Sequence, residues 1–391
     1  MFDYIVVGSG AGGAAVAREL ACSGKKVLIL EAGPEAKASE ANRAYSIIPS
    51  AVEIWSTLCF GGTTMVTMGN AVRSDTYSDL SKYYDIAEKD LGVSKVPDTH
   101  IGPATKALLD CSGDWQRMPK AIDFSKCKMC GRCAVGCPHG ARWDASRYLA
   151  EAARNGAEIL TSTEVKKILI GNNSASGVES FNGQRFEGNA VILCAGGIET
   201  PRILARSGVD GAGKGLFVDT FMTVGGVKRG AGSTTELGMA LVIKREGYLL
   251  SPHYSSFVMP YLTSKGIASK PSDILSMMVK IEDEPAGIVS QEGVEKPITQ
   301  KDSKLLEQGR VEAIEILTAA GVEKGSIVST YYRGTHPGGT CSKVVNSSYA
   351  TDVDGLYISD ASVIPGPFGI PPMLTIIAIA KKLSASILGR D

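Results

Sequence analysis

Apolar and polar positions near the N-terminus predict a strand, a helix and a second strand in close succession. Residues 3–7 form a short apolar run that enters a glycine-rich turn, and an alanine-rich amphipathic helix is expected at residues 14–21. Residues 27–30 are apolar again and end at Glu31. The same pattern predicts strands at 191–194, 222–224, 239–244, 274–281 and 355–360, and helices at 303–320 and 375–388. Strands that alternate with helices favour an α/β fold.

Composition narrows the class of protein. A chain of 391 residues exceeds the usual single-domain size, so two domains are expected. The formal net charge is +0 and no basic tract is present, which argues against nucleic acid or an acidic membrane surface as a partner. The apolar run at residues 374–380 is too short to span a bilayer, and a strand-like run begins at residue 2 where a signal peptide would lie.

A cytoplasmic, reducing location is therefore expected. Five of the nine cysteines then need no disulfide partner. These are Cys22, Cys59, Cys111, Cys194 and Cys341.

The first strand and helix flank a dinucleotide-binding fingerprint. Gly8 would make the tight turn, Gly10 would let a pyrophosphate approach the backbone, and Gly13 would pack the helix on the strand. Glu31 follows Gly13 by 18 residues, where a carboxylate accepts ribose hydroxyls and would repel a 2′-phosphate. The motif predicts a Rossmann-like site but does not separate FAD from NAD.

Four cysteines form a compact run. Cys127, Cys130, Cys133 and Cys137 follow a C-x2-C-x2-C-x3-C-P spacing, the ferredoxin signature for an iron–sulfur cluster. A zinc site is the plain alternative, although zinc motifs usually split their ligands into two separated pairs. Disulfides or free thiols are the third reading. Either Cys137 completes a [4Fe–4S] centre, or three cysteines hold a [3Fe–4S] centre.

The whole chain resembles the glucose–methanol–choline (GMC) oxidoreductases. The pieces that carry the resemblance are Gly8 to Gly13 with Glu31, Gly61-Gly62-Thr63-Thr64, residues 80–93, residues 195–204, His336-Pro-Gly-Gly-Thr-Cys341 and the strand ending at Asp360. The cysteine run is similar to the C-x5-C-x3-C-P motif of the cluster-bearing FAD sugar and alcohol dehydrogenases, with Cys130 added. Those relatives bind [3Fe–4S], so Cys130 is the natural fourth ligand for [4Fe–4S].

This resemblance implies FAD and a set of residues that contact it. The pyrophosphate would lie at the first glycine loop, Glu31 at the adenosine ribose, the Val165 backbone at the adenine, and the Gly61-Gly62 loop along the isoalloxazine. The further contacts that it implies are Thr63, Asn70, Ala195, Gly196, Asp360, Ala361, Pro372 and Met373.

The resemblance also implies a division into domains. Residues 1–215 and 330–391 would form a discontinuous FAD-binding domain that includes the iron–sulfur segment 124–142. Residues 216–329 would form a smaller α+β substrate domain with an antiparallel sheet. This region is short for the family, which predicts an open pocket or one completed by a partner subunit or a second copy of the chain.

His336 lies at the position of the family's catalytic histidine. It would accept the hydroxyl proton of an alcohol while hydride moves to the flavin. Of the other histidines, His139 follows the cysteines and is expected to tune or shield the cluster. His100 and His253 are expected to be packing or surface residues.

Two positions depart from the family pattern. The second His or Asn beside the flavin is replaced by Pro371, which has neither a side-chain donor nor a backbone N–H. A frequent Asn after the glycines is replaced by Thr67, and Asn70 is the candidate substitute. Both changes bear on how the substrate oxygen is held.

Together these features predict an FAD- and iron–sulfur-dependent dehydrogenase acting on alcohol- or sugar-like donors. Electrons would leave singly for a carrier protein or a quinone-like acceptor, because an oxidase needs no such relay. The alternatives are a reductase fed by a ferredoxin-like donor, an electron-transfer subunit without alcohol chemistry, and a flavoprotein with a structural zinc. The lack of a second dinucleotide fingerprint disfavours an NAD-dependent dehydrogenase. The substrate and the oligomeric state are not encoded in any recognisable motif.

Overall fold

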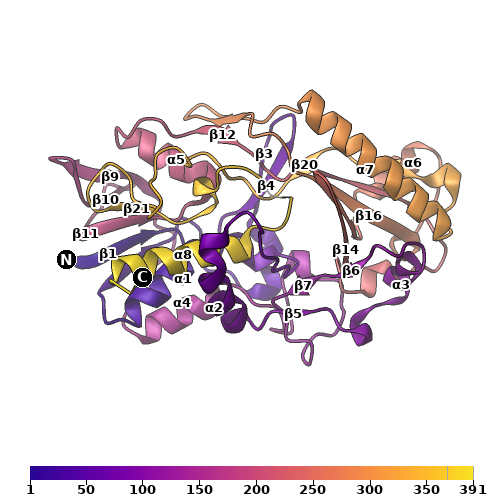
Figure 1. Cartoon of the computed structure of the whole chain (residues 1–391), viewed down its shortest axis with the longest axis horizontal. Helices are drawn as coiled ribbons and strands as arrows, with labels where there is room; N and C mark the ends of the chain where they lie inside the picture. Colours follow the sequence, from indigo (N-terminus) through magenta and orange to yellow (C-terminus); the bar gives the residue numbers. More distant parts are fainter. Residues whose placement is uncertain (368, 391) are drawn as a thin grey trace.

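Two large sheets form the two ends of the molecule in the computed structural model, which describes residues 1–367 and 369–390 (Figure 1). The first sheet has seven strands in the order β8-β2-β1-β11-β10-β9, with β21 paired to β11. Its strands are β1 (Phe2–Val7), β2 (Val27–Leu30), β8 (Glu158–Leu160), β9 (Val165–Gly171), β10 (Ser174–Ser180), β11 (Arg185–Leu193) and β21 (Leu356–Ile358).

The core of this sheet is parallel. β1 pairs in parallel with β2 and β11, and β11 pairs in parallel with β21. β9 and β10 extend the sheet as an antiparallel hairpin. The carboxyl ends of β1, β11 and β21 therefore meet at one edge, where ligands of such sheets bind.

Helices cover both faces of the first sheet (Figure 1). On one face α1 (Ala11–Ala21) packs against α4 (Ser146–Arg154) and α8 (Met373–Ile387), and α8 also packs against α2 (Ser81–Leu91). On the other face α5 (Gly196–Arg206) packs against β9. The elements predicted from the N-terminal pattern and the C-terminal helix are thus present, with bounds that differ by at most three residues from those predicted.

The second sheet has nine strands in the order β3-β4-β20-β13-β16-β15-β14-β6, with β19 paired to β13. Its strands are β3 (Tyr45–Ile48), β4 (Glu53–Thr57), β6 (Gln116–Arg117), β13 (Phe221–Val227), β14 (Leu241–Arg245), β15 (Tyr248–Pro252), β16 (Ile274–Ile281), β19 (Val328–Ser329) and β20 (Arg333–Gly334). The run from β13 to β6 is antiparallel. The expected α/β class, with an antiparallel sheet beside the Rossmann-like one, is confirmed.

Side chains of the second sheet alternate between two environments. Ile243, Leu250 and Val279 join the apolar cluster that contains Leu306 and Leu317 of α7 (Gln300–Ala319). Val242, Leu249 and Met278, one position away in each strand, join another cluster that also contacts three of the four run cysteines. One face of this sheet therefore packs on α7, and the other faces the interior of the molecule.

Short elements complete the chain. They are α3 (Pro103–Leu109), α6 (Val258–Ser264), the three-stranded sheet β12 (Lys214–Leu216), β17 (Gly287–Val289) and β18 (Val294–Glu295), and the pair β5 (Ser94–Lys95) and β7 (Pro119–Lys120). The helix α7 begins with a capping box in which Thr299 and Asp302 satisfy each other's backbone N–H. The second sheet takes strands from both sides of residues 216 and 329, and the domain division at those residues stays a prediction.

Candidate functional site

Glycines bring three chain segments together at the carboxyl edge of the first sheet. A Cβ atom on Gly8 would lie 2.4 Å from the carbonyl oxygen of Cys194, and one on Gly13 would lie 1.9 Å from that of Gly8. A Cβ on Gly12 would lie 1.8 Å from the carbonyl oxygen of Ser359. Any side chain at these positions would force the segments apart, so the glycines set the spacing of the site.

The N-terminus of α1 opens onto free space. A Cβ on Gly10 would meet nothing within 4 Å, and the N-cap residue Gly10 makes no side-chain cap. A Cβ on Gly196, which starts α5, would also meet nothing within 4 Å, but the Gly196 N–H is already bound by the Asp360 carboxylate. Uncapped N–H groups at a helix start bind phosphate charge, so this part of the chain fits the pyrophosphate of a dinucleotide.

Glu31 is held at the end of β2 by three donors. Its Oε2 accepts the Ser9 backbone N–H at 3.0 Å and the Ser9 hydroxyl at 2.6 Å, and its Oε1 accepts the Gly33 N–H at 2.8 Å. Burial raises the pKa of Glu31, although the donors oppose the shift. A carboxylate offers about four acceptor positions, so one remains for a ribose hydroxyl.

Ser9 connects this carboxylate to the second glycine loop. Its hydroxyl also accepts the Gly61 N–H at 2.9 Å. Gly62 lies against the first loop, since a Cβ there would be 3.0 Å from the Gly10 Cα. The two glycine loops, 51 residues apart between Gly10 and Gly61, are therefore fastened to each other through one serine side chain.

Asp360 has the same role at the end of β21. Its Oδ2 accepts the Gly196 N–H at 2.9 Å and the Thr200 hydroxyl at 2.6 Å, and its Oδ1 accepts the Ser362 N–H at 2.8 Å. Burial raises the pKa of this carboxyl group. Asp360 thus joins the start of α5 to the short helix Ala361–Val363.

The remaining residues of the expected FAD set lie around this edge. Ala195 is the N-cap residue of α5, and Pro372 and Met373 start α8. Val165 begins β9, just after Thr163, whose N–H bonds the Glu31 carbonyl. The contacts of these residues with FAD stay predictions.

The Gly61 loop separates its two threonines. Thr63 is exposed, whereas the buried Thr64 hydroxyl donates to the Gly61 carbonyl at 2.6 Å and accepts the Ala145 N–H at 2.9 Å. Thr64 therefore anchors the loop.

Asn70 is buried with its amide engaged at both ends, by Lys120 Nζ at 2.5 Å and by the Met239 sulfur at 3.3 Å. One N–H of its amide is not used in these two contacts, and its role as the substitute for the family Asn stays a prediction.

His336 belongs to a buried charged assembly. Its Nδ1 lies 2.9 Å from Asp219 Oδ2, and the same oxygen lies 2.8 Å from Lys280 Nζ. Asp219 and Lys280 side chains are each 2% exposed, while His336 keeps 24%. Asp219 has φ +54°, a left-handed conformation that costs about 1–3 kcal/mol and is typical of functional sites.

The charges in this assembly set the protonation of His336. Burial lowers the pKa of His336, and the Lys280 cation lowers it further, against the opposing Asp219 carboxylate. Burial alone would raise the pKa of Asp219, but Lys280 and His336 outweigh it and leave the pKa below its ordinary value. The ionised Asp219 lies at Nδ1 and favours the neutral imidazole, whose other nitrogen has no hydrogen bond to any residue in 1–367 and 369–390.

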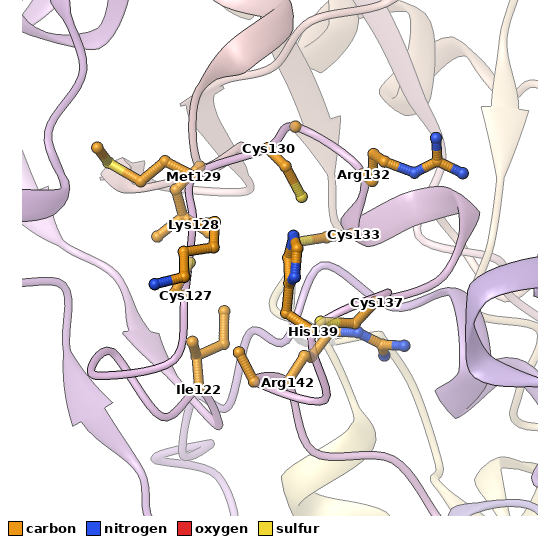
Figure 2. Close-up of a pocket in the computed structure, with 13 residues that line it drawn as sticks. Ile122, Cys127, Lys128, Met129, Cys130, Arg132, Cys133, Cys137, His139 and Arg142 are labelled. Carbon is orange, nitrogen blue, oxygen red and sulfur yellow. The ribbon is translucent and has the colours of Figure 1, made fainter.

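The four run cysteines line one cavity, together with His139 and Arg142 (Figure 2). All four thiols are free and half-buried. N–H groups of His139, Ala141 and Arg142 lower the pKa of Cys137 against the effect of burial. No group of three or more His, Cys, Asp or Glu side chains in residues 1–367 and 369–390 is arranged to hold a metal ion. The donor set suits a soft metal centre, but the sulfurs are not closed on a single ion.

Comparisons with known proteins identify the family. The chain matches the GMC oxidoreductase family over residues 2–225 and again over residues 270–380. The chain belongs to the GMC oxidoreductases. It is 33% identical to the uncharacterized protein MJ1450 of Methanocaldococcus jannaschii, covering 99% of this chain and 100% of that one. It is 24% identical to the long-chain-alcohol oxidase FAO3 of Arabidopsis thaliana, over 98% of this chain and 67% of the relative.

Solved structures agree with the fold of this GMC oxidoreductase. Pyridoxine 4-oxidase from Mesorbium loti superposes with a TM-score of 0.76 at 15% identity, covering 100% of both chains. Formate oxidase from Aspergillus oryzae RIB40 superposes with a TM-score of 0.75 at 15% identity, over 99% of this chain and 98% of that one. Family membership supports FAD as the cofactor, in agreement with the helix starts and carboxylates described above.

Two buried cations of this GMC oxidoreductase lie between the Gly61 loop and the cysteine cavity. Arg142, which lines the cavity, donates to the carbonyl groups of Thr64 and Met65. Lys120 donates to the Met68 carbonyl at 2.9 Å and to Asn70. Burial lowers the pKa of Lys120 to about 8. Neither cation forms a close ion pair with a carboxylate within the described residues, although the Asp144 carboxylate raises the pKa of Arg142 against the effect of burial.

Sequence reasoning missed several residues of the site. Ser9, Thr64, Lys120, Arg142, Asp219 and Lys280 carry its internal contacts. Ser9 and Thr64 lie inside motifs that were recognised, so their hydroxyl groups could have been suspected. The two lysines, Arg142 and Asp219 had no signal, because a lone charged residue in a strand or loop is usually on the surface.

Ser9→Ala tests the link between the two glycine loops. We expect it to lower the free energy of unfolding by about 1–3 kcal/mol, because the buried Gly61 N–H loses its acceptor and Glu31 loses a donor. Urea denaturation measures the change, with Ser174→Ala, at an exposed serine, as the matched control. Equal stability of the two variants would show that the Ser9 contacts are not structural.

Two substitutions in the His336 assembly should change the pKa of His336 in opposite directions. Lys280→Met removes a cation that lowers the pKa of His336, so we expect that pKa to rise; Asp219→Asn removes a carboxylate that raises it, so we expect a fall. NMR titration of the ring protons measures both, since the chain has only 4 histidines and His336→Gln assigns the signal. Shifts in one common direction would contradict this electrostatic account. Each variant also breaks a buried ion pair, at a cost of about 3–5 kcal/mol.

Proposed function

We propose that the chain is an FAD-dependent dehydrogenase of CH–OH donors that passes electrons through an iron–sulfur cluster to an external acceptor. The observation that carries this proposal is the position of Lys120 and Arg142. Each contacts the loop of residues 61–70, and Arg142 also lines the cysteine cavity. A layer of buried side chains thus borders the candidate sites for both redox groups.

His336 is the proposed general base. Asp219 accepts a hydrogen bond from the Nδ1–H group of His336. The other ring nitrogen is then the one that takes a proton from a substrate hydroxyl. The lowered pKa keeps the ring neutral, as a base must be before it accepts a proton. Bound FAD would supply the acceptor for the hydride that leaves the carbon.

Asp219 and Lys280 are proposed as positioning residues. Asp219 fixes the ring tautomer, and Lys280 keeps the carboxylate ionised. The segment that carries Asp219 is itself clamped, since Asp283 accepts the N–H groups of Val218 at 3.1 Å and Thr220 at 3.0 Å. The backbone N–H of His336 donates to the Val218 carbonyl at 3.2 Å. The segment that carries His336 is therefore hydrogen-bonded directly to the segment that carries its partner Asp219.

The cysteine spacing favours a polynuclear cluster over a single ion. Structural zinc sites usually take their ligands as two separated pairs. The four cysteines instead lie within eleven consecutive residues and line one cavity (Figure 2). A bound cluster would pass electrons one at a time. Lys120 and Arg142 would offset the negative charge of its thiolates, and Cys127, Cys130, Cys133 and Cys137 would be its ligands.

The proposed acceptor is an electron-carrier protein or a quinone-like molecule. The cavity lies at a loop in which Gly131, Arg132 and His139 are exposed, so the redox group would be close to the surface. No helix in residues 1–367 and 369–390 is long and apolar enough to cross a bilayer. A diffusing acceptor could therefore reach this loop without passing through the substrate pocket.

His336→Gln tests the alcohol chemistry. Removing the general base should slow substrate-driven flavin bleaching by about 10²–10⁴-fold while leaving bound FAD in place. Anaerobic absorbance after addition of candidate alcohols and sugars measures this, with His100→Gln as the control because His100 lies in the short turn Asp98–His100, on a different element. Bleaching at the unchanged rate in His336→Gln would refute the assignment.

Cys130→Ser tests the cluster and its ligands. The unmodified protein should hold about four iron atoms, and the variant about three, because one thiolate ligand is lost. Iron and sulfide analysis with EPR before and after dithionite measures this, and Cys22→Ser, at an exposed cysteine outside the run, should match the unmodified protein. Bound zinc without iron would instead establish the structural zinc reading.

A further inference from the structure

A second cavity lies beside the antiparallel sheet. One side is apolar and consists of buried residues of a single cluster, namely Val72, Met118, Val242, Leu249 and Ile370. Pro371 lines one part of it, next in sequence to Pro372 and Met373, where FAD is expected. The cavity therefore adjoins the candidate flavin site at the very residue where the family's second polar group is replaced.

The charged residues of this cavity are all cations. Lys95, Arg117 and Lys244 line it, and no Asp or Glu does. Lys95 and Lys244 are exposed, and within residues 1–367 and 369–390 neither has an ion-pair partner. Arg117 binds Asp98 through one nitrogen at 2.6 Å, but its other terminal nitrogen, Nη1, is buried and unpartnered. A buried donor without a protein acceptor can bind a ligand or a water molecule.

Strand register places this cavity on the same face of the sheet as the His336 assembly. Lys244 pairs with Leu249, and Leu249 pairs with Lys280. Residues that pair across strands point to the same face, so this cross-strand row runs from a cavity cation to the lysine that binds Asp219. The opposite face is covered by α7. A molecule in the cavity would lie along the row that leads to the proposed base.

We propose that this cavity binds a hydroxyl-bearing substrate whose far end carries a carboxylate or a phosphate. The anionic group would contact Lys95, Arg117 and Lys244, and an apolar carbon frame would lie against Leu249, Val242 and their neighbours. The hydroxyl end would then point toward Pro371 and His336. This inference rests on the proposed function and gives it a substrate class: amphipathic and anionic, in contrast to a neutral sugar or a quaternary amine.

The anionic anchor would also account for Pro371. An alcohol held only at its reacting end needs two polar contacts to fix its oxygen. A substrate held at its far end by charge is already oriented, so His336 alone would suffice at the hydroxyl. The missing side-chain donor at Pro371 and the three cations that line the same cavity are then two parts of one arrangement.

Four probes that share one carbon chain and one hydroxyl separate the possibilities. They are 8-hydroxyoctanoate, 8-hydroxyoctyl phosphate, octane-1,8-diol and 8-aminooctan-1-ol. Isothermal titration into the FAD-loaded protein should give binding of at least one anion about tenfold tighter than the diol, as one charge-assisted hydrogen bond provides. The amine should bind most weakly, and added salt should reduce the preference. The stronger of the two anions identifies the carboxylate or the phosphate class.

Lys95→Gln combined with Lys244→Gln should remove most of the preference for the anion. The matched control is Lys304→Gln, an exposed lysine on α7 behind the sheet, which should keep it. All three substitutions are on the surface, so the fold should be unaffected. Equal binding of diol and anions, binding of none of the probes, or an unchanged preference in the double variant would overturn the proposal.

Binding is measured here without turnover, so the outcome is separate from that of the proposed function. A His336→Gln protein that still prefers the anion would support the cavity even if no probe is oxidised. Conversely, a protein that oxidises the diol as readily as the hydroxy acid would retain the dehydrogenase proposal and refute the anionic substrate class.

Discussion

Close approach of backbone to backbone at Gly8, Gly12 and Gly13 is the constraint on which the site depends. It brings the ends of β1, β11 and β21 together, so that the starts of α1 and α5 face the same space. Two buried carboxylates, Glu31 and Asp360, then fasten the loops that leave those strands. Protein N–H and hydroxyl groups occupy most of the hydrogen-bond acceptor positions of each carboxylate. The cofactor site is therefore largely built before any ligand enters it, and little conformational entropy remains to be lost on binding.

Buried charge is the second theme of the molecule. Lys120, Arg142, Lys280 and Lys296 are all nearly inaccessible to water, yet only the last two are paired with carboxylates. Isolated cations are costly inside a protein, and here carbonyl and amide oxygens meet them in place of anions. This arrangement makes sense where negative charge arrives with a bound group, as thiolates around a metal centre would supply. The cation placement thus connects the cysteine loop to the rest of the proposed chemistry.

The fold and the cofactor edge could be read from the sequence to a large extent. The strand at Val27–Leu30 and the strand at Ile274–Ile281 are predicted to the residue, because runs dominated by apolar residues and bounded by polar ones leave little freedom. Glycine motifs carry their own geometry, so Gly8, Gly61 and Gly196 could be placed. Asp219 and Lys280 could not, since their partnership joins a loop to a strand 61 residues away and exists only after the sheet has formed. The cluster of cavity cations could not be predicted for the same reason, because Lys95, Arg117 and Lys244 come from three different strands.

The register of the antiparallel sheet determines which side chains share a face. Side chains alternate strictly along β14, β15 and β16, so a slip of one residue in any of them would turn its inward-facing members onto the helix side. Lys244, Leu249 and Lys280 would then no longer share a surface. Insertions in this part of related chains should accordingly occur in the connecting loops and in even-numbered steps within strands. Selection on which molecule is accepted would act as much on hydrogen-bond register as on the identity of any single side chain.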